Sequence, residues 1–308
     1  MPVEPEVPPA TGARVPWEAV HPPVRAAIED RLGGRIVEAV TQTGGFSPAA
    51  AVRVRLADGG RAFVKAVDSA TNSESTRIYR DEIRAAALLP ESVPAPRLLA
   101  HVELDGWVAL AFEDIEGRHP VLPWRRDELD RVRDVLRRLA AEHTPAPAGL
   151  PPVKDIFGAA FQGFRHLAGT GHDDPWVVRH LDKLVALESE WGEAAAGDAL
   201  VHADVRADNI LFAGDRVHLV DWPYACTGAP WFDLVGLLPS VAMQGGPEPH
   251  ELLDTLDPAV TSVVAALAGF FAWQGGLPAP PGLPTLRPFQ RAQGVVAMRW
   301  LRHRTGWA

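Results

Sequence analysis

The stretch that constrains the fold most is VHADVRADNILFAGDRVHLVD, residues 201–221. It begins with a polar segment that contains His202, Asp204 and Asn209. Two short apolar runs follow, separated by a Gly-Asp pair that is typical of a turn. The second run ends at Asp221, so the pattern predicts a β-hairpin that returns a second carboxylate towards the first polar segment.

This spacing suits phosphoryl transfer from a nucleotide. Asp204 can orient or take the proton of an attacking hydroxyl. Asn209 and Asp221 offer the oxygen ligands that Mg²⁺ prefers when it is bound to a triphosphate. The alternative is an ordinary polar loop in which Asp and Asn serve turn chemistry.

The segment H-A-D-V-R-A-D-N followed by D-W-P resembles the catalytic and metal-binding segments of the aminoglycoside phosphotransferase family, which is similar to protein kinases and choline kinases. The resemblance extends from about Gly33 to the C-terminus. It implies that Asp204 is the catalytic base and that Asn209 and Asp221 hold magnesium. It also implies an α+β, protein-kinase-like fold with two lobes.

The N-terminal third alternates between strand-like and helical patterns. We predict a helix over 23–32, strands over 36–41, 50–56 and 61–67, a helix over 75–89, and a hairpin of strands 98–104 and 107–112. This order predicts a small antiparallel sheet with one inserted helix. We therefore assign 15–113 to a nucleotide-binding N-lobe and the proline-rich residues 1–14 to a disordered arm.

The remaining residues, 114–308, are mainly helical in pattern. We predict helices over 127–143, 176–191, 231–238, 259–273 and 286–304, with a proline-rich linker over 278–284. We expect this larger C-lobe to carry the catalytic loop, the metal site and the substrate-binding surface.

A glycine-containing loop, Gly44, Gly45, Phe46 and Ser47, lies between two predicted strands. Glycine lets the backbone approach a phosphate closely and point amides at it. A plain hairpin turn is the alternative. The position of the loop before the strand that contains Lys65 favours nucleotide binding.

Lys65 interrupts the apolar strand A-F-V-K-A-V. A lysine in such a strand ordinarily extends towards solvent, but here we expect it to reach the α- and β-phosphates. The resemblance implies a glutamate on the following helix that pairs with this lysine. We assign Glu82 to that role, with the neighbouring Asp81 as the alternative.

Three further groups complete the predicted site. Phe112, Glu113 and Asp114 resemble the connector whose backbone binds an adenine edge. Arg206 either stabilises charge on the transferring phosphoryl group or forms a surface salt bridge. We expect supporting roles for three other side chains: His202 as an organiser of the catalytic loop, and Asp208 and Asp233 as braces.

The amino-acid composition limits the kinds of partner that we expect the protein to bind. The net charge of −9 argues against nucleic acid. The N-terminus lacks the basic start and apolar core of a secretion signal, and the longest apolar stretch, 260–273, is too short to span a bilayer. We expect a cytoplasmic monomer or homodimer with no membrane partner. The single cysteine, Cys226, excludes an intrachain disulfide.

These features predict an ATP- and Mg²⁺-dependent kinase that phosphorylates a hydroxyl of a small molecule, with GTP as an alternative donor. The resemblance implies an aminoglycoside-like antibiotic as acceptor, and hence antibiotic resistance. Choline or ethanolamine, homoserine, a sugar and a nucleoside are alternatives, and a catalytically silent nucleotide-binding protein on a kinase fold is another. Protein kinase activity is disfavoured because D-W-P replaces D-F-G and no activation loop follows.

Two features bear on the acceptor. An acidic cluster before a C-lobe helix could offer partners for ammonium groups, although a solvated helix surface is the preferred explanation; it comprises Glu248, Glu251, Asp254 and Asp257. Tryptophans could hold a quaternary ammonium by cation–π contact, although core packing is the simpler explanation; Trp231, Trp273, Trp300 and Trp307 are examples.

Overall fold

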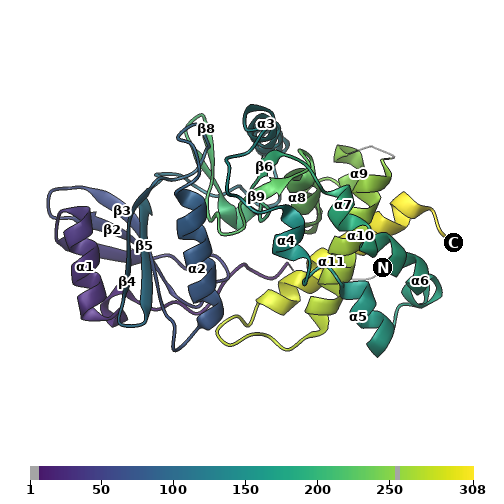
Figure 1. Cartoon of the computed structure of the whole chain (residues 1–308), viewed down its shortest axis with the longest axis horizontal. Coiled ribbons are helices and arrows are strands. Elements are labelled where there is room, and N and C mark those ends of the chain that lie inside the picture. The colour runs from purple at the N-terminus through teal and green to yellow at the C-terminus, as the bar shows by residue number, and fades with distance from the viewer. Residues whose placement is uncertain (1–6, 254–256) are drawn as a thin grey trace.

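The computed structural model describes residues 7–253 and 257–308 and shows two lobes (Figure 1). The N-lobe is built on an antiparallel five-stranded sheet of order β1-β2-β3-β5-β4. The strands are β1 (Ile36–Thr41), β2 (Ala50–Leu56), β3 (Arg61–Asp68), β4 (Leu98–Leu104) and β5 (Trp107–Glu113).

One helix covers each face of this sheet: α1 (Pro22–Leu32) on the outer face and α2 (Ser73–Ala86) on the face towards the C-lobe (Figure 1). Side chains alternate between the faces of a strand. In β5, Ala109 and Ala111 therefore pack with the α1 cluster, whereas Leu110 and Phe112 pack with the α2 cluster.

The C-lobe is mainly helical. Its helices are α3 (Arg126–Glu142), α4 (Val153–Phe157), α5 (Gly163–Thr170), α6 (Pro175–Ser189), α7 (Trp191–Ala194), α8 (Phe232–Met243), α9 (Pro249–Leu252), α10 (Pro258–Gly276) and α11 (Leu286–Thr305). The C-lobe also contains two small antiparallel sheets: β6 (Ala199–Val201) pairs with β9 (Cys226–Gly228), and β7 (Ile210–Ala213) forms a hairpin with β8 (Arg216–Leu219). Short 3₁₀ turns occur at η1 (Trp17–Ala19) and η2 (Ala207–Asn209).

Helix α10 forms the centre of the C-lobe and packs against α11, α5 and α6. It is longer than the apolar stretch seen in the sequence, and by length and composition alone it would cross a membrane. Its central side chains, from Val263 to Ala268, are buried inside the lobe. This burial identifies α10 as a core helix.

The predicted α+β two-lobe fold is confirmed, and the strands 36–41, 50–56 and 98–104 have the predicted bounds. Helix α2 begins at Ser73, two residues earlier than predicted, because the Asn72 side chain caps it by accepting from the Ser75 amide at 2.7 Å. The sequence did not predict α4, α5, α7, α9, β6 or β9.

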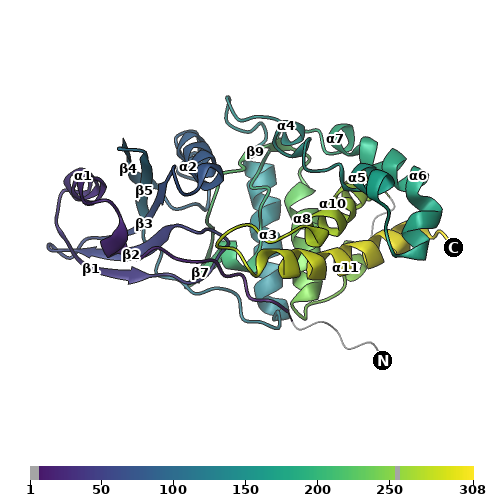
Figure 2. The ribbon, with the colours of Figure 1, turned by 90° about the horizontal axis from the view of Figure 1, so that it is seen from below.

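The N-terminal arm differs from the expectation of disorder. Residues 1–6 lie outside the described part, but residues 7–14 run along the glycine loop. Gly45 donates its amide to the Ala10 carbonyl at 2.9 Å, and Ala13 donates to Gly282 at 2.8 Å. The arm therefore lies beside both the glycine loop and the loop that precedes α11 (Figure 2).

Candidate active site

A cleft of about 1360 Å³ lies between the two lobes. Its lining includes all the residues predicted for catalysis, nucleotide binding and metal binding: Gly44, Gly45, Phe46, Ser47, Lys65, Glu82, Phe112, Glu113, Asp114, Asp204, Arg206, Asn209 and Asp221. Residues separated by more than 170 positions in the chain are thus brought to one surface.

Lys65 on β3 connects the two lobes electrostatically. Its Nζ lies 2.8 Å from both carboxylate oxygens of Glu82 and 2.7 Å from Oδ1 of Asp221. Burial alone would lower the pKa of Lys65, but the carboxylates of Asp221 and Glu82 raise it above its usual value, so the amine is charged. Of the two acidic candidates on α2, Glu82 is therefore the partner, and Asp81 instead pairs with Arg77 and Arg84 on the helix surface.

The catalytic loop is held from below by Asp233 on α8. Its two carboxylate oxygens accept from the amides of His202, at 2.9 Å, and Ala203, at 2.7 Å. Ala203 and Asp221 are non-glycine residues with positive φ, at 66° and 69°. Such strained backbone persists only where surrounding contacts enforce it, and the Asp233 bonds supply that restraint at Ala203. The predicted bracing role of Asp233 is confirmed.

His202 is buried beneath the loop. Its Nε2 lies 3.0 Å from the Val220 carbonyl and its Nδ1 lies 3.2 Å from the Asp204 amide. Burial lowers the pKa of His202 to about 4, so the ring is neutral near pH 7. A neutral ring that donates from Nε2 and accepts at Nδ1 satisfies both contacts, as expected for a loop organiser.

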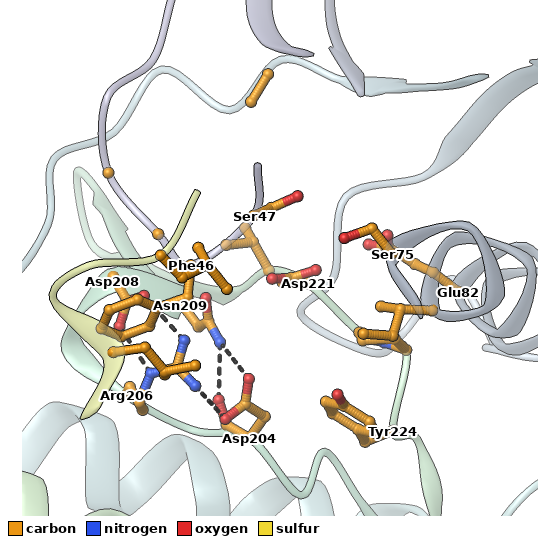
Figure 3. A pocket seen from close by; sticks show the side chains of 18 of the residues that line it. Phe46, Ser47, Ser75, Glu82, Asp204, Arg206, Asp208, Asn209, Asp221 and Tyr224 are labelled. Carbon is orange, nitrogen blue, oxygen red and sulfur yellow. Dashed lines mark hydrogen bonds and ion pairs between the residues drawn. The ribbon is translucent and has the colours of Figure 1, made fainter. Parts of the chain in front are cut away.

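Asp204 lies in the cleft with Arg206 and Asn209 beside it (Figure 3). Arg206 bridges the carboxylates of Asp204 and Asp208. Burial, assisted by the charges of Asp208 and Asp221, raises the pKa of Asp204 to about 7 although Arg206 opposes the rise. A carboxyl group with this pKa is suited to accept a proton near neutral pH.

Arg206 is not a surface salt bridge, because its side chain is only 18% exposed and lies beneath the Phe46 ring at 5.6 Å. Phe46 in turn contacts Phe289 of α11 at 5.1 Å. The glycine loop therefore reaches the C-lobe. Gly45 has φ 85°, a conformation that favours glycine.

The described residues contain no group of three or more His, Cys, Asp or Glu side chains that would hold a metal alone. Asn209 uses its Nδ2 to donate to the Asp204 carbonyl at 2.8 Å, which leaves its amide oxygen as an acceptor. Asp221 adds carboxylate oxygens. Burial alone would raise the pKa of Asp221, but the nearby charge of Lys65 has the larger effect and lowers it, so the carboxylate is ionised near neutral pH. This oxygen set fits Mg²⁺ if nucleotide phosphates supply further ligands.

The connector after β5 keeps its side chains in ion pairs. Asp114 pairs with Arg53 at 3.2 Å and Arg61 at 2.6 Å, and Glu113 pairs with Arg97 at 3.5 Å. Only main-chain groups and the Phe112 ring therefore remain for an adenine edge.

The acidic cluster predicted from the sequence does not reach the cleft. Glu248 pairs with Arg299 at 2.5 Å, Asp257 caps α10, and neither they nor Glu251 line the cleft. Asp254 lies outside the described residues. Glu248 and Asp257 therefore fit the alternative of a solvated helix surface, since their contacts lie outside the cleft.

Aromatic rings line the part of the cleft beyond Asp204. Phe157 stacks on Phe161 at 5.2 Å and contacts Tyr224 at 5.7 Å, while Phe161 contacts Phe270 at 5.7 Å. Phe232 completes this aromatic wall. None of the four tryptophans considered for cation–π binding lines the cleft; Trp300, for example, is buried. The sequence did not single out the aromatic wall, because its members come from four separate segments.

Comparisons with known proteins agree with this geometry. A family model for the phosphotransferase enzyme family (APH) matches residues 41–259, more than two thirds of the chain. Homoserine kinase from Parvibaculum lavamentivorans (strain DS-1 / DSM 13023 / NCIMB 13966) is 33% identical over 125 residues, 40% of this chain and 37% of that protein. Homoserine kinase from Methylobacterium sp. (strain 4-46) is 41% identical over 59 residues, 19% of this chain and 18% of that protein. The chain thus aligns with well under half the length of these curated relatives.

Solved structures show the same fold. A macrolide 2'-phosphotransferase type I has a TM-score of 0.50 at 16% identity, covering 95% of this chain and 94% of that one. An aminoglycoside phosphotransferase from Alicyclobacillus acidocaldarius subsp. acidocaldarius DSM 446 has a TM-score of 0.52 at 15% identity, covering 88% and 92%. Because the family model matches most of the chain and the fold agrees with it, the chain belongs to the phosphotransferase enzyme family, whose members act on hydroxyl groups of small molecules.

Proposed function

We propose that the protein is an ATP- and Mg²⁺-dependent kinase that transfers the γ-phosphoryl group to a hydroxyl of a small molecule. The observation that carries this proposal is the convergence of Lys65, Asp204, Asn209 and Asp221 on one cleft. Catalysis of phosphoryl transfer is mostly positioning and charge stabilisation, and these four side chains provide both.

Each residue has a separate task in this proposal. Lys65, fixed by Glu82, binds phosphate oxygens when Asp221 turns to the metal. Asp204, whose carboxylate is positioned by its ion pair with Arg206, would orient the acceptor hydroxyl and accept its proton. Asn209 and Asp221 would hold magnesium, which when bound neutralises charge on the phosphates. The backbone of 44–47 would cover the triphosphate, and main-chain groups at 112–114 would bind the adenine.

The charges of the cleft bear on the acceptor. Four of the carboxylates that line the cleft pair with Lys65 or Arg206: Glu82, Asp221, Asp204 and Asp208. The other four are Glu74, Glu113, Asp114 and Asp233. Three of these are committed to ion pairs or backbone amides. Among the described residues, Glu74 alone is a lining carboxylate without an ion pair or hydrogen bond.

An aminoglycoside carries several ammonium groups, which one carboxylate cannot pair. The aromatic wall instead favours an acceptor with an apolar body and few positive charges. We therefore place such hydroxyl compounds ahead of an aminoglycoside-like antibiotic. Homoserine is a second candidate, because the two partly aligned curated relatives are homoserine kinases and Arg287 lies in the cleft as a partner for a carboxylate.

A coupled ADP-release screen tests both levels of the proposal. The panel contains aminoglycosides, macrolides, homoserine, choline, sugars and nucleosides, each with Mg²⁺ and ATP or GTP. We expect turnover with an apolar hydroxyl compound. An Asp204→Ala variant should lose at least about 100-fold in kcat, because general base catalysis contributes that much, and should still bind MgATP.

Two results would count against the proposal. Turnover by Asp204→Ala at the wild-type rate would remove the assigned base. Stabilisation of the wild type by MgATP without ADP release for any acceptor would favour a catalytically silent nucleotide-binding protein. Preferred turnover of an aminoglycoside would contradict the acceptor class while leaving the kinase proposal intact.

A further inference from the structure

Arg14, in the N-terminal arm, enters the nucleotide end of the cleft. Its Nη1 donates to the Ser47 carbonyl at 2.6 Å, and its Nη2 donates to the Gly44 carbonyl and lies 3.4 Å from the Gly45 carbonyl. One guanidinium group thus contacts the carbonyls of three of the four residues of the glycine loop.

The backbone of the arm fixes the direction of this side chain. Val15 donates to Ala49 at 3.2 Å, immediately after Arg14, and Ala13 donates to Gly282 at 2.8 Å, immediately before it. A residue anchored on both sides does not depend on its own side-chain contacts to stay in the cleft. The placement of Arg14 is therefore a property of the chain path.

The guanidinium is also near the acidic side of the site. Burial lowers the pKa of Arg14, while Tyr79, Asp221 and Asp208 raise it. The group stays charged because the pKa of arginine lies far above neutral pH. Its Nε has no hydrogen-bond partner among the described residues, although it is buried.

The Gly45 amide donates to Ala10, but the amides of Phe46 and Ser47 have no hydrogen-bond partner among the described residues and are available to an anion. The loop carbonyls bind Arg14 here, and the metal ligand Asp221 contributes to its electrostatic surroundings. A triphosphate between the glycine loop and Asp221 would lie within reach of this charge, in addition to Lys65 and Arg206.

We propose that Arg14 is a nucleotide-binding residue that holds the glycine loop by its carbonyls and supplies a third positive charge beside the triphosphate. This inference rests on the proposed kinase function. It adds a residue from outside the matched family region, which begins at residue 41.

Calorimetric binding of MgATP and of adenosine tests the proposal. Arg14→Ala should weaken MgATP binding about 10- to 100-fold, the range expected when hydrogen bonds to a charged group are lost. Adenosine lacks phosphates, so its affinity should change less than about twofold. Arg14→Lys keeps the charge and should recover part of the MgATP affinity, although it loses the forked geometry.

Arg35→Ala is the matched control. It removes the same charge from an exposed N-lobe position that does not line the cleft, and it should leave both affinities unchanged. Unfolding temperatures without nucleotide show whether each variant folds.

The inference fails if Arg14→Ala binds MgATP as tightly as the wild type. It also fails if MgATP and adenosine affinities fall equally, because that pattern indicates a general structural role. Failure of the wild type itself to bind MgATP would instead overturn the proposed kinase function, so the two failures are distinguishable.

Discussion

Replacing Asp233 with alanine should uncouple the catalytic loop from α8. The carboxylate is buried and accepts the amides of His202 and Ala203 at 2.9 Å and 2.7 Å. After the substitution, both donors face a methyl group. The positive φ of Ala203 then loses the contact that stabilises it.

The expected change in the free energy of unfolding follows from these two hydrogen bonds. Leaving one buried donor unsatisfied costs about 1–3 kcal/mol, so two cost about 2–6 kcal/mol. Burial raises the pKa of Asp233 to about 6, which shows that the ionised carboxylate is itself costly to bury. Relief of that cost offsets part of the loss, and we expect the free energy of unfolding to fall by about 3 kcal/mol.

Urea unfolding followed by circular dichroism measures this change, and the ADP-release assay measures turnover. Asp233→Asn keeps one oxygen acceptor and should lose about half as much stability. Asp182→Ala removes an exposed carboxylate on α6 and should change stability by less than about 0.5 kcal/mol.

An Asp233→Ala variant with wild-type stability would refute the bracing argument. A variant that is destabilised by the expected amount but keeps full turnover would show that the two bonds stabilise the lobe without positioning Asp204.

Two further predictions address the base and the core. Because burial raises the pKa of Asp204 to about 7 and Asp204 must be ionised to accept a proton, kcat/KM should rise with pH up to about 7 and then level off. Because Arg206 lowers the pKa of Asp204, Arg206→Gln should move the rise in kcat/KM to higher pH. A wild-type profile that is flat from about pH 5 to 8 would contradict the assignment of Asp204 as the base. A Cβ at Gly163 would lie 1.9 Å from the Gly269 carbonyl oxygen, so Gly163→Ala should lower the free energy of unfolding by about 1–3 kcal/mol in urea titrations. Gly169→Ala on the same helix meets nothing within 4 Å and should raise it by about 0.4–1 kcal/mol; equal effects at the two sites would rule out the clash.

The N-lobe sheet was predictable because its strands are short apolar or alternating runs, and glycine turns separate β2 from β3 and β4 from β5. Helix α5 was missed because it is short and has no side-chain cap. Strands β6 and β9 each contain three residues, too few for a periodic pattern, and pair across 25 positions from Val201 to Cys226.

Site residues that form a short motif in the sequence could be predicted, whereas the direction in which a side chain points could not. Glu82 and Asp81 are adjacent, and only the placement of α2 over the sheet decides that Glu82 faces Lys65. Likewise, Glu248 is close in sequence to other acids but points to Arg299 on α11. No sequence pattern indicated a role for Arg14, because its hydrogen-bond partners lie at least 30 positions away in the chain.

The contact between the N-terminal arm and the loop before α11 has a mechanical consequence. Thr285 donates to the Thr11 carbonyl at 2.7 Å, so the lobes are joined at this edge as well as through the chain that follows β5. Together with the Lys65–Asp221 and Phe46–Phe289 contacts, this hydrogen bond limits how far the two lobes can move apart. In the proposed kinase, these contacts would have to open before the lobes could separate, so the arm, which precedes the matched family region, would influence nucleotide exchange.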